Sequence, residues 1–163
     1  MDDVRMRSSG AQPVGTGVAV SRIPDRHAPE GASMSDIRSQ LVELCAGFNA
    51  HDLDRIMALF AEDCVLEMPR GGDPWGTRWR GKENVRKGLA ERFAGLPDVH
   101  YGDAQHLVDE SAATGITKWT LTGTRPDGRR VEVWGCDFYT FANGRVVRKD
   151  CLGAHDCLLR CVG

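Results

Sequence analysis

Hydrophobic residues recur every three or four positions in three segments of the chain, over residues 37–48, 53–60 and 82–94. This spacing lines up apolar side chains on one face of a helix, so each segment is predicted to be helical. Between the first two segments the sequence NAHD interrupts the pattern. Asp52, at its end, is well placed to accept a hydrogen bond from the first turn of the second helix.

Apolar and polar residues alternate in most of the remaining sequence, as they do in β-strands. Strands are predicted at 64–69, 99–108, 114–124, 130–141 and 145–152. The glycine- and proline-containing segment RGGDPWGTRWRG (70–81) is predicted to be a loop. Helices gathered on one side of an antiparallel meander indicate an α+β fold, a cone-shaped curved sheet wrapped around helices with an interior pocket.

The two ends of the chain lack this periodicity. Residues 1–33 are rich in glycine, proline, serine and charge, and are predicted to be a disordered N-terminal extension. The organised domain is predicted over 34–153, and residues 154–163 form a C-terminal tail of no assigned role. Met34 begins the first organised segment, so both Met1 and Met34 remain open as the true start.

Composition narrows the range of partners. The net charge of the 163 residues is −2 without a dense basic run, which argues against nucleic acid and anionic membranes as partners. No segment has the apolar core of a signal peptide or a membrane span, so a cytoplasmic location is expected. The six cysteines contain no Cys-x-x-Cys pair and are expected to be reduced thiols without metal. No glycine-rich phosphate loop is present, so no nucleotide cofactor is expected.

Two turns set the predicted strand register. The turn RPDGR (125–129) fits a three-residue loop that sets Thr117 opposite Asp137. Asp137 then shares a face with apolar residues, namely Trp119, Leu121, Val131, Val133, Tyr139 and Phe141. The turn ANGR (142–145) fits a two-residue hairpin, and counting from it sets Asp150 opposite Asp137.

This register predicts a pair of buried carboxyl groups. Desolvation and a neighbouring carboxylate both raise a carboxyl pKa, so Asp137 and Asp150 are predicted to share one proton near neutral pH. Such a pair can act as general acid and base, which makes both residues catalytic candidates. Asp150 could instead pair with Arg148, or lie in water at the rim of the sheet.

Other polar and aromatic residues are candidates for ligand binding. Tyr101 and Tyr139 offer hydroxyl donors suited to a ketone or enolate oxygen, and His106 is a candidate for proton transfer or a structural histidine. Trp75 and Trp79 could cover a ligand or pack under the loop, and alternation favours an outward Glu67 over an inward one. The candidate set is Trp119, Tyr139, Tyr101, Trp75, Trp79, Met68, Glu67 and His106.

Four stretches of the chain resemble a known family. They are NAHDLDRIMALFAEDCVLEMP, WGTRWRGKENVRKGLAERFAGLPDVHY, WTLTGTRPDGRRVEVWGCDFYTF and NGRVVRKD. Together they resemble the SnoaL-like group of the nuclear-transport-factor-2-like superfamily, which includes ketosteroid isomerases, polyketide cyclases and limonene epoxide hydrolases. The resemblance covers about 35–152 and implies an α+β cone with a pocket, commonly dimeric through the outer face of the sheet.

The resemblance carries over to few catalytic positions. The isomerase base falls on Met68 and the oxyanion tyrosine on Leu44, while the second oxyanion group falls on Asp137. Asp150 matches the last-strand carboxylate of the epoxide hydrolases, but their Arg-x-Asp pair falls near Lys118 and Thr120. Steroid isomerisation is therefore not expected.

The sequence thus predicts a SnoaL-like enzyme that acts by acid/base chemistry on an apolar carbonyl-bearing or cyclic substrate, without cofactor or metal. The alternative is a non-catalytic ligand-binding or dimerisation module of the same fold. A small apolar molecule and a second copy of the chain are the expected partners.

Overall fold

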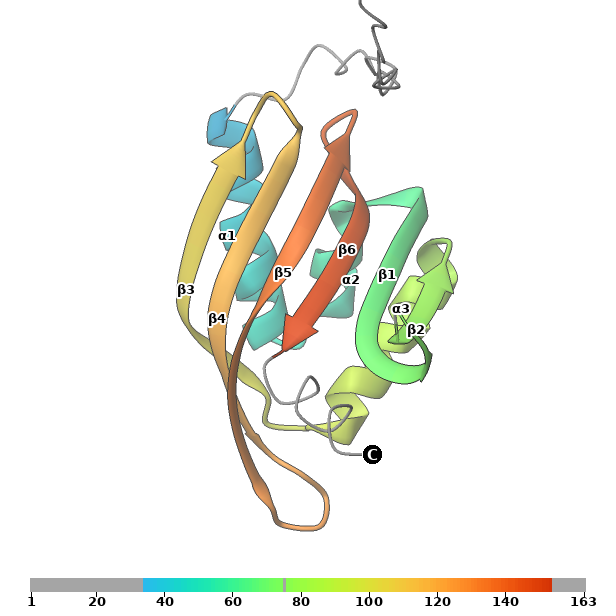
Figure 1. Cartoon of the computed structure of the whole chain (residues 1–163), viewed down its shortest axis with the longest axis vertical. Helices are drawn as coiled ribbons and strands as arrows, with labels where there is room; N and C mark the ends of the chain where they lie inside the picture. The colour runs from blue at the N-terminus through green and yellow to red at the C-terminus, as the bar shows by residue number, and fades with distance from the viewer. Residues whose placement is uncertain (1–33, 75, 154–163) are drawn as a thin grey trace, which may run out of the picture.

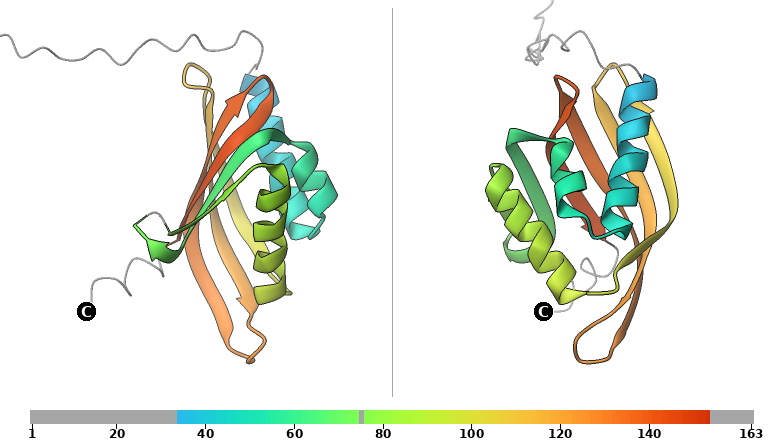
Figure 2. Two further views of the ribbon diagram at one scale, coloured as in Figure 1. Left: turned by 90° about the vertical axis from the view of Figure 1, so that its right-hand side faces the viewer. Right: turned by 180° about the vertical axis from the view of Figure 1, so that it is seen from behind.

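The computed structural model describes residues 34–74 and 76–153, in which three helices lie on one face of a curved six-stranded sheet (Figures 1 and 2). This is the predicted α+β cone. The predictions for 1–33 and 154–163 lie outside the described residues. The helices are α1 (Met34–Asn49), α2 (Leu53–Ala58) and α3 (Lys82–Gly95), and the strands are β1 (Phe60–Asp73), β2 (Gly76–Arg80), β3 (His100–Asp109), β4 (Thr114–Thr124), β5 (Arg130–Ala142) and β6 (Arg145–Gly153).

The three helices are those that the apolar spacing predicts, and they bury the predicted faces. Ile37, Leu41 and Leu44 of α1 are each at most 1% exposed and pack in the main core beneath the sheet. The Asp52 carboxylate accepts a hydrogen bond from the Arg55 backbone N–H at 3.0 Å, which caps α2 as predicted. Of the helices in the described residues, none is both long and apolar enough to cross a membrane.

The prediction of a loop at 70–81 is wrong. Residues up to Asp73 continue β1, and Gly76–Arg80 form β2, which pairs antiparallel with β1. Gly76 adopts φ +82° where the chain turns back, and a Cβ there would lie 1.9 Å from the Met68 carbonyl oxygen. The glycines and proline of this segment therefore serve a tight reversal between two strands, while β2 is too short for its alternation to stand out.

The strand order is β2-β1-β6-β5-β4-β3, with β1 parallel to β6. The register predicted from RPDGR is confirmed: the Arg125 N–H donates to the Arg129 carbonyl at 2.9 Å, and Thr117 lies opposite Asp137. Asp137 accordingly lies on the buried, concave face of β5, 4% exposed.

The register predicted for β6 is wrong beyond its first two residues. The hairpin starts as expected, with Ala142 opposite Arg145, but Thr140 pairs with Arg148 and leaves Val147 as an extra residue in β6. Such a β-bulge reverses the facing of every later side chain. Lys149 therefore lies opposite Tyr139 on the concave face, and Asp150 lies opposite the exposed Phe138 on the outer face.

Candidate functional site

A pocket of about 980 Å³ lies between the concave face of the sheet and α3. A volume of this size suits a small organic ligand. Apolar side chains from both layers form most of its wall; they include Met68, Trp79, Leu96, Trp119, Leu121 and Val133. Figure 2 shows that the β4–β5 turn extends beyond the helices at one end of the sheet, and pocket-lining residues Arg125, Arg129 and Arg130 come from this turn and its flanks.

Asp137 and Lys149 form a buried ion pair on the wall of this pocket. The Lys149 Nζ lies 2.6 Å from Asp137 Oδ1, and the two residues are 3% and 4% exposed respectively. Lys149 also donates a hydrogen bond to Cys151 Sγ at 2.9 Å, while the Tyr139 hydroxyl donates to Asp137 Oδ2 at 3.3 Å. Lys149, Asp137 and Cys151 all line the pocket, so a ligand in it can reach the pair.

The charges of these groups follow from their surroundings. Burial works to lower the Lys149 pKa, but the Asp137 carboxylate and other neighbouring groups outweigh it and hold the pKa well above its ordinary value. Burial raises the pKa of the Tyr139 hydroxyl well above its ordinary value and that of the Cys151 thiol to about 12. At neutral pH the pocket therefore presents the Lys149 ammonium and the Cys151 thiol, which is not a nucleophilic thiolate. Tyr139 does not line the pocket; its buried phenol lies behind Asp137.

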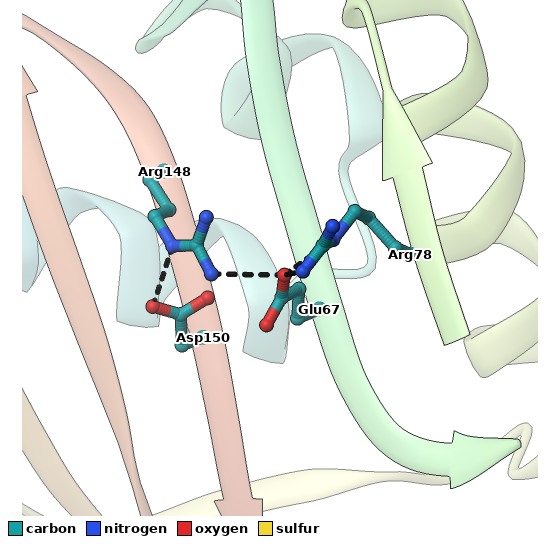
Figure 3. A network of polar contacts seen from close by, with 4 residues as sticks. All are labelled: Glu67, Arg78, Arg148 and Asp150. Atoms are coloured by element: carbon teal, nitrogen blue, oxygen red, sulfur yellow. Dashed lines mark hydrogen bonds and ion pairs between the residues drawn. The ribbon is translucent and has the colours of Figure 1, made fainter. Parts of the chain in front are cut away.

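Asp150 does not face Asp137, so the predicted pair of carboxyl groups does not form. Its carboxylate accepts a hydrogen bond from Arg148 Nε at 2.8 Å on the outer face of the sheet (Figure 3). Glu67 lies on the same face, where Arg148 Nη2 approaches its carboxylate at 2.8 Å and Arg78 contacts it from β2. This network joins β2, β1 and β6 and keeps Glu67 and Asp150 away from the pocket.

The other candidate residues divide between the pocket and the rest of the molecule. Met68, Trp79, Tyr101 and Trp119 line the pocket, and the Tyr101 and Trp119 rings pack edge to face with centroids 5.5 Å apart. His106 does not line it; the His106 Nδ1 hydrogen-bonds to Thr117 Oγ1 at 2.9 Å. Trp75 lies outside the described residues.

Lys149 and Arg92 are pocket residues that the sequence did not single out. Arg92, in the last turn of α3, interacts with Tyr101. Lys149 could have been suspected on energetic grounds, since a carboxylate on an apolar face needs a cationic partner. In the described part of the chain no group of three or more histidine, cysteine, aspartate or glutamate side chains is arranged to hold a metal ion.

Several solved structures have the same fold as this chain at low sequence identity. The chain is similar to an NTF2-like protein of unknown function from Burkholderia pseudomallei K96243, at 19% identity and TM-score 0.68, with 78% of this chain and 97% of that chain covered. It is also similar to a proposed polyketide cyclase from Xanthomonas campestris pv. campestris, at 16% identity and TM-score 0.64, with coverage of 72% and 89%.

A third similar structure is TerC co-crystallised with polyporic acid, at 15% identity and TM-score 0.65, with coverage of 77% of this chain and 96% of that chain. No curated protein matches the sequence. The SnoaL-like domain family matches residues 41–149, which is most of the described structure. The chain belongs to the SnoaL-like domain family, with the cone fold of NTF2-like proteins.

Proposed function

We propose that the pocket binds an apolar cyclic carbonyl compound and catalyses proton transfer at the carbon next to the carbonyl group. The Asp137 carboxylate removes the proton from this carbon, and the electron pair of the broken C–H bond moves to the carbonyl oxygen to give an enolate. The Lys149 ammonium donates a hydrogen bond to that oxygen. Asp137 returns the proton to the same or another carbon, so the step consumes no co-reactant.

The buried ion pair in the pocket wall is the observation that carries this proposal. Buried ion pairs contribute little to stability compared with apolar side chains of the same size, so one that borders a ligand-sized pocket suggests a chemical use. During the proposed step the negative charge passes from Asp137 to the substrate oxygen beside the same cation. The Lys149 ammonium therefore pairs with the Asp137 carboxylate before proton transfer and with the enolate oxygen after it, so the ammonium has an anionic partner throughout the step.

The remaining groups suit the same chemistry. The Tyr139 hydroxyl, held to Asp137 Oδ2, fixes the orientation of the carboxylate. Trp119, Leu121 and Val133 offer apolar surface for a ring-bearing substrate and help exclude water. The proposed polyketide cyclase among the structural neighbours shares the fold, which supports a carbonyl substrate without identifying it.

The test is hydrogen exchange on a panel of cyclic ketones and cyclic 1,3-diketones in D2O, followed by proton NMR. The wild-type protein should accelerate the loss of the signal of the protons next to the carbonyl group for at least one compound. The variant Val133→Trp, which fills the pocket, should not. If compounds bind in the pocket but no exchange is accelerated across the panel, the chain is a non-catalytic ligand-binding module.

We also propose that a second copy of the chain covers the outer face of the sheet. Leu107, Ile116 and Phe138 form a row across β3, β4 and β5 on that face, and Leu107 and Trp134 are each 65% exposed. Homodimer interfaces are more apolar than other protein surface, and one self-complementary patch suffices for a two-fold dimer.

Light scattering coupled to size exclusion should therefore find a dimer of the wild-type chain and a monomer of Trp134→Lys/Phe138→Lys. The control Val42→Lys alters an equally apolar exposed residue on α1, 52% exposed, and should remain dimeric. A monomeric wild-type chain, or a dimer that survives the double substitution, would contradict the proposal.

A further inference from the structure

Charge is unevenly distributed between the pocket and the rest of the protein. The chain as a whole carries a net charge of −2. Among the described residues, six cationic and three acidic side chains line the pocket. The cationic ones are Arg70, Arg92, Arg125, Arg129, Arg130 and Lys149. Because Lys149 and Asp137 neutralise each other, the excess of positive charge comes from the arginines.

These five arginines form a rim at one end of the molecule, which we call the arginine rim. Arg92 comes from the last turn of α3, Arg70 from the far part of β1, and the other three from the β4–β5 turn and its flanks. The C-terminal end of α3 and the β4–β5 turn lie at the same end of the cone in both views of Figure 2. Segments distant in the sequence thus bring positive charge to the edge of one pocket.

Two of the rim arginines, Arg125 and Arg130, form no ion pair within the described residues, although the Asp127 and Asp98 carboxylates attract them at longer range. Arg129 forms an ion pair at 2.6 Å with Asp127, which does not itself line the pocket. For Arg125 and Arg130, no carboxylate lies within ion-pair distance among residues 34–74 and 76–153. The acidic rim residues, Glu91 and Glu132, are fewer than the arginines. A cleft lined by one sign of charge with apolar walls concentrates ligands of the opposite charge.

We infer that the pocket selects an organic anion, with an apolar ring system against Trp119, Leu121 and Val133 and a carboxylate or similar anionic group at the arginine rim. Guanidinium groups bind planar carboxylates through two parallel hydrogen bonds and remain charged at every physiological pH. The apolar wall between the rim and the Asp137–Lys149 pair then holds the ring. This inference rests on the proposed function and adds the charge of its substrate.

Two fluorescent dyes with the same rings test this inference without a known substrate. Anilinonaphthalene sulfonate carries an anionic group, and phenylnaphthylamine is its uncharged counterpart. Arg125→Glu/Arg130→Glu should weaken binding of the sulfonate dye about tenfold at low salt, because two cations become two anions at a partly solvated rim. Binding of the uncharged dye should change less than about twofold. Added salt should weaken the binding of the sulfonate dye and leave the binding of the uncharged dye unchanged.

Two controls make the outcome decisive. Arg38→Glu changes the charge of an exposed residue that does not line the pocket, and it should leave both dyes unaffected. Val133→Trp should remove binding of both dyes, since it fills the pocket. Equal effects of the rim variant on the two dyes, no effect on either, or dye binding that survives Val133→Trp would each overturn the inference.

The dye experiment is independent of the proton-transfer proposal. Asp137→Asn should lower the rate of hydrogen exchange by about a hundredfold or more and leave the difference between the two dyes intact, because Asp137 lies at the ion pair and not at the rim. Selective binding of the anionic dye without hydrogen exchange would contradict the proton-transfer proposal and indicate a non-catalytic module that binds organic anions. Hydrogen exchange without selectivity between the dyes would support the proposed enzyme activity and overturn the inference that its substrate is an anion.

Discussion

Asp137→Ala is expected to lower the free energy of unfolding by about 3–5 kcal/mol, the usual cost of breaking a buried ion pair from one side. The substitution leaves Lys149, 3% exposed, without its carboxylate partner in a largely apolar environment. Equilibrium unfolding in urea, followed by circular dichroism, measures the change. Asp150→Ala serves as the matched control, because its pair with Arg148 is partly exposed and should contribute no more than about 1 kcal/mol.

Removing both charges should restore the lost stability. In Asp137→Leu/Lys149→Met neither charge is buried, and apolar side chains of similar size fill the site, so stability should equal or exceed that of the wild type. If this double variant is as unstable as Asp137→Ala, the loss comes from packing around Asp137 and not from an orphaned ammonium. The two residues would then not be coupled in the way the 2.6 Å distance implies.

Asp137→Asn is expected to lower the rate of hydrogen exchange on an active cyclic ketone by about a hundredfold to ten-thousandfold, the range typical of loss of a general base. Asparagine keeps the shape of aspartate and its carbonyl oxygen can still accept a hydrogen bond from Lys149, but its NH2 group can no longer accept one from Tyr139, and the side chain cannot take up the substrate proton. Proton NMR in D2O measures the rate. Ligand affinity should change little, which separates a loss of chemistry from a loss of binding.

Two control variants test whether the loss of exchange comes from the missing base and not from a general effect of the substitution on the protein. Asp150→Asn removes a carboxylate from the outer face and should retain the wild-type exchange rate. Asp137→Leu/Lys149→Met should be folded and stable yet inactive, which shows that the loss of activity does not result from a loss of stability. Activity that persists in Asp137→Asn would refute the assigned base, and equal loss in Asp150→Asn would indicate an indirect effect.

The sequence was most informative where turn chemistry and apolar alternation agreed. RPDGR fixed the pairing of β4 with β5 and so placed Asp137 on the concave face beside Trp119. The helices followed from apolar spacing and the Asp52 cap. The longest patterns carried the fold class, as in β4 and β5 with 11 and 13 residues, and β2, with five residues, was not predicted.

The partner of Asp137 could not be read from the same patterns. The bulge at Val147 adds one residue to β6, and adjacent valines give no sign of which one is extra. A single-residue shift exchanges Asp150 for Lys149 on the concave face, so the predicted pair of carboxyl groups becomes a carboxylate paired with an ammonium. The volume of the pocket and the arginine rim depend on curvature and on contacts between distant segments, which alternation does not encode.

Lys149 remains charged in the pocket wall because of Asp137. With Asp137 present, the stability that Lys149 contributes is complete below its ordinary pKa near 10.5 and is lost as the pH rises through the raised folded-state value. NMR titration of the labelled Lys149 side chain measures this directly. The pKa should lie above the ordinary lysine value in the wild type and fall in Asp137→Asn, because this substitution removes the largest of the neighbouring charges that raise it while burial still lowers it. An ordinary lysine pKa in both proteins would contradict the buried ion pair and the chemistry built on it.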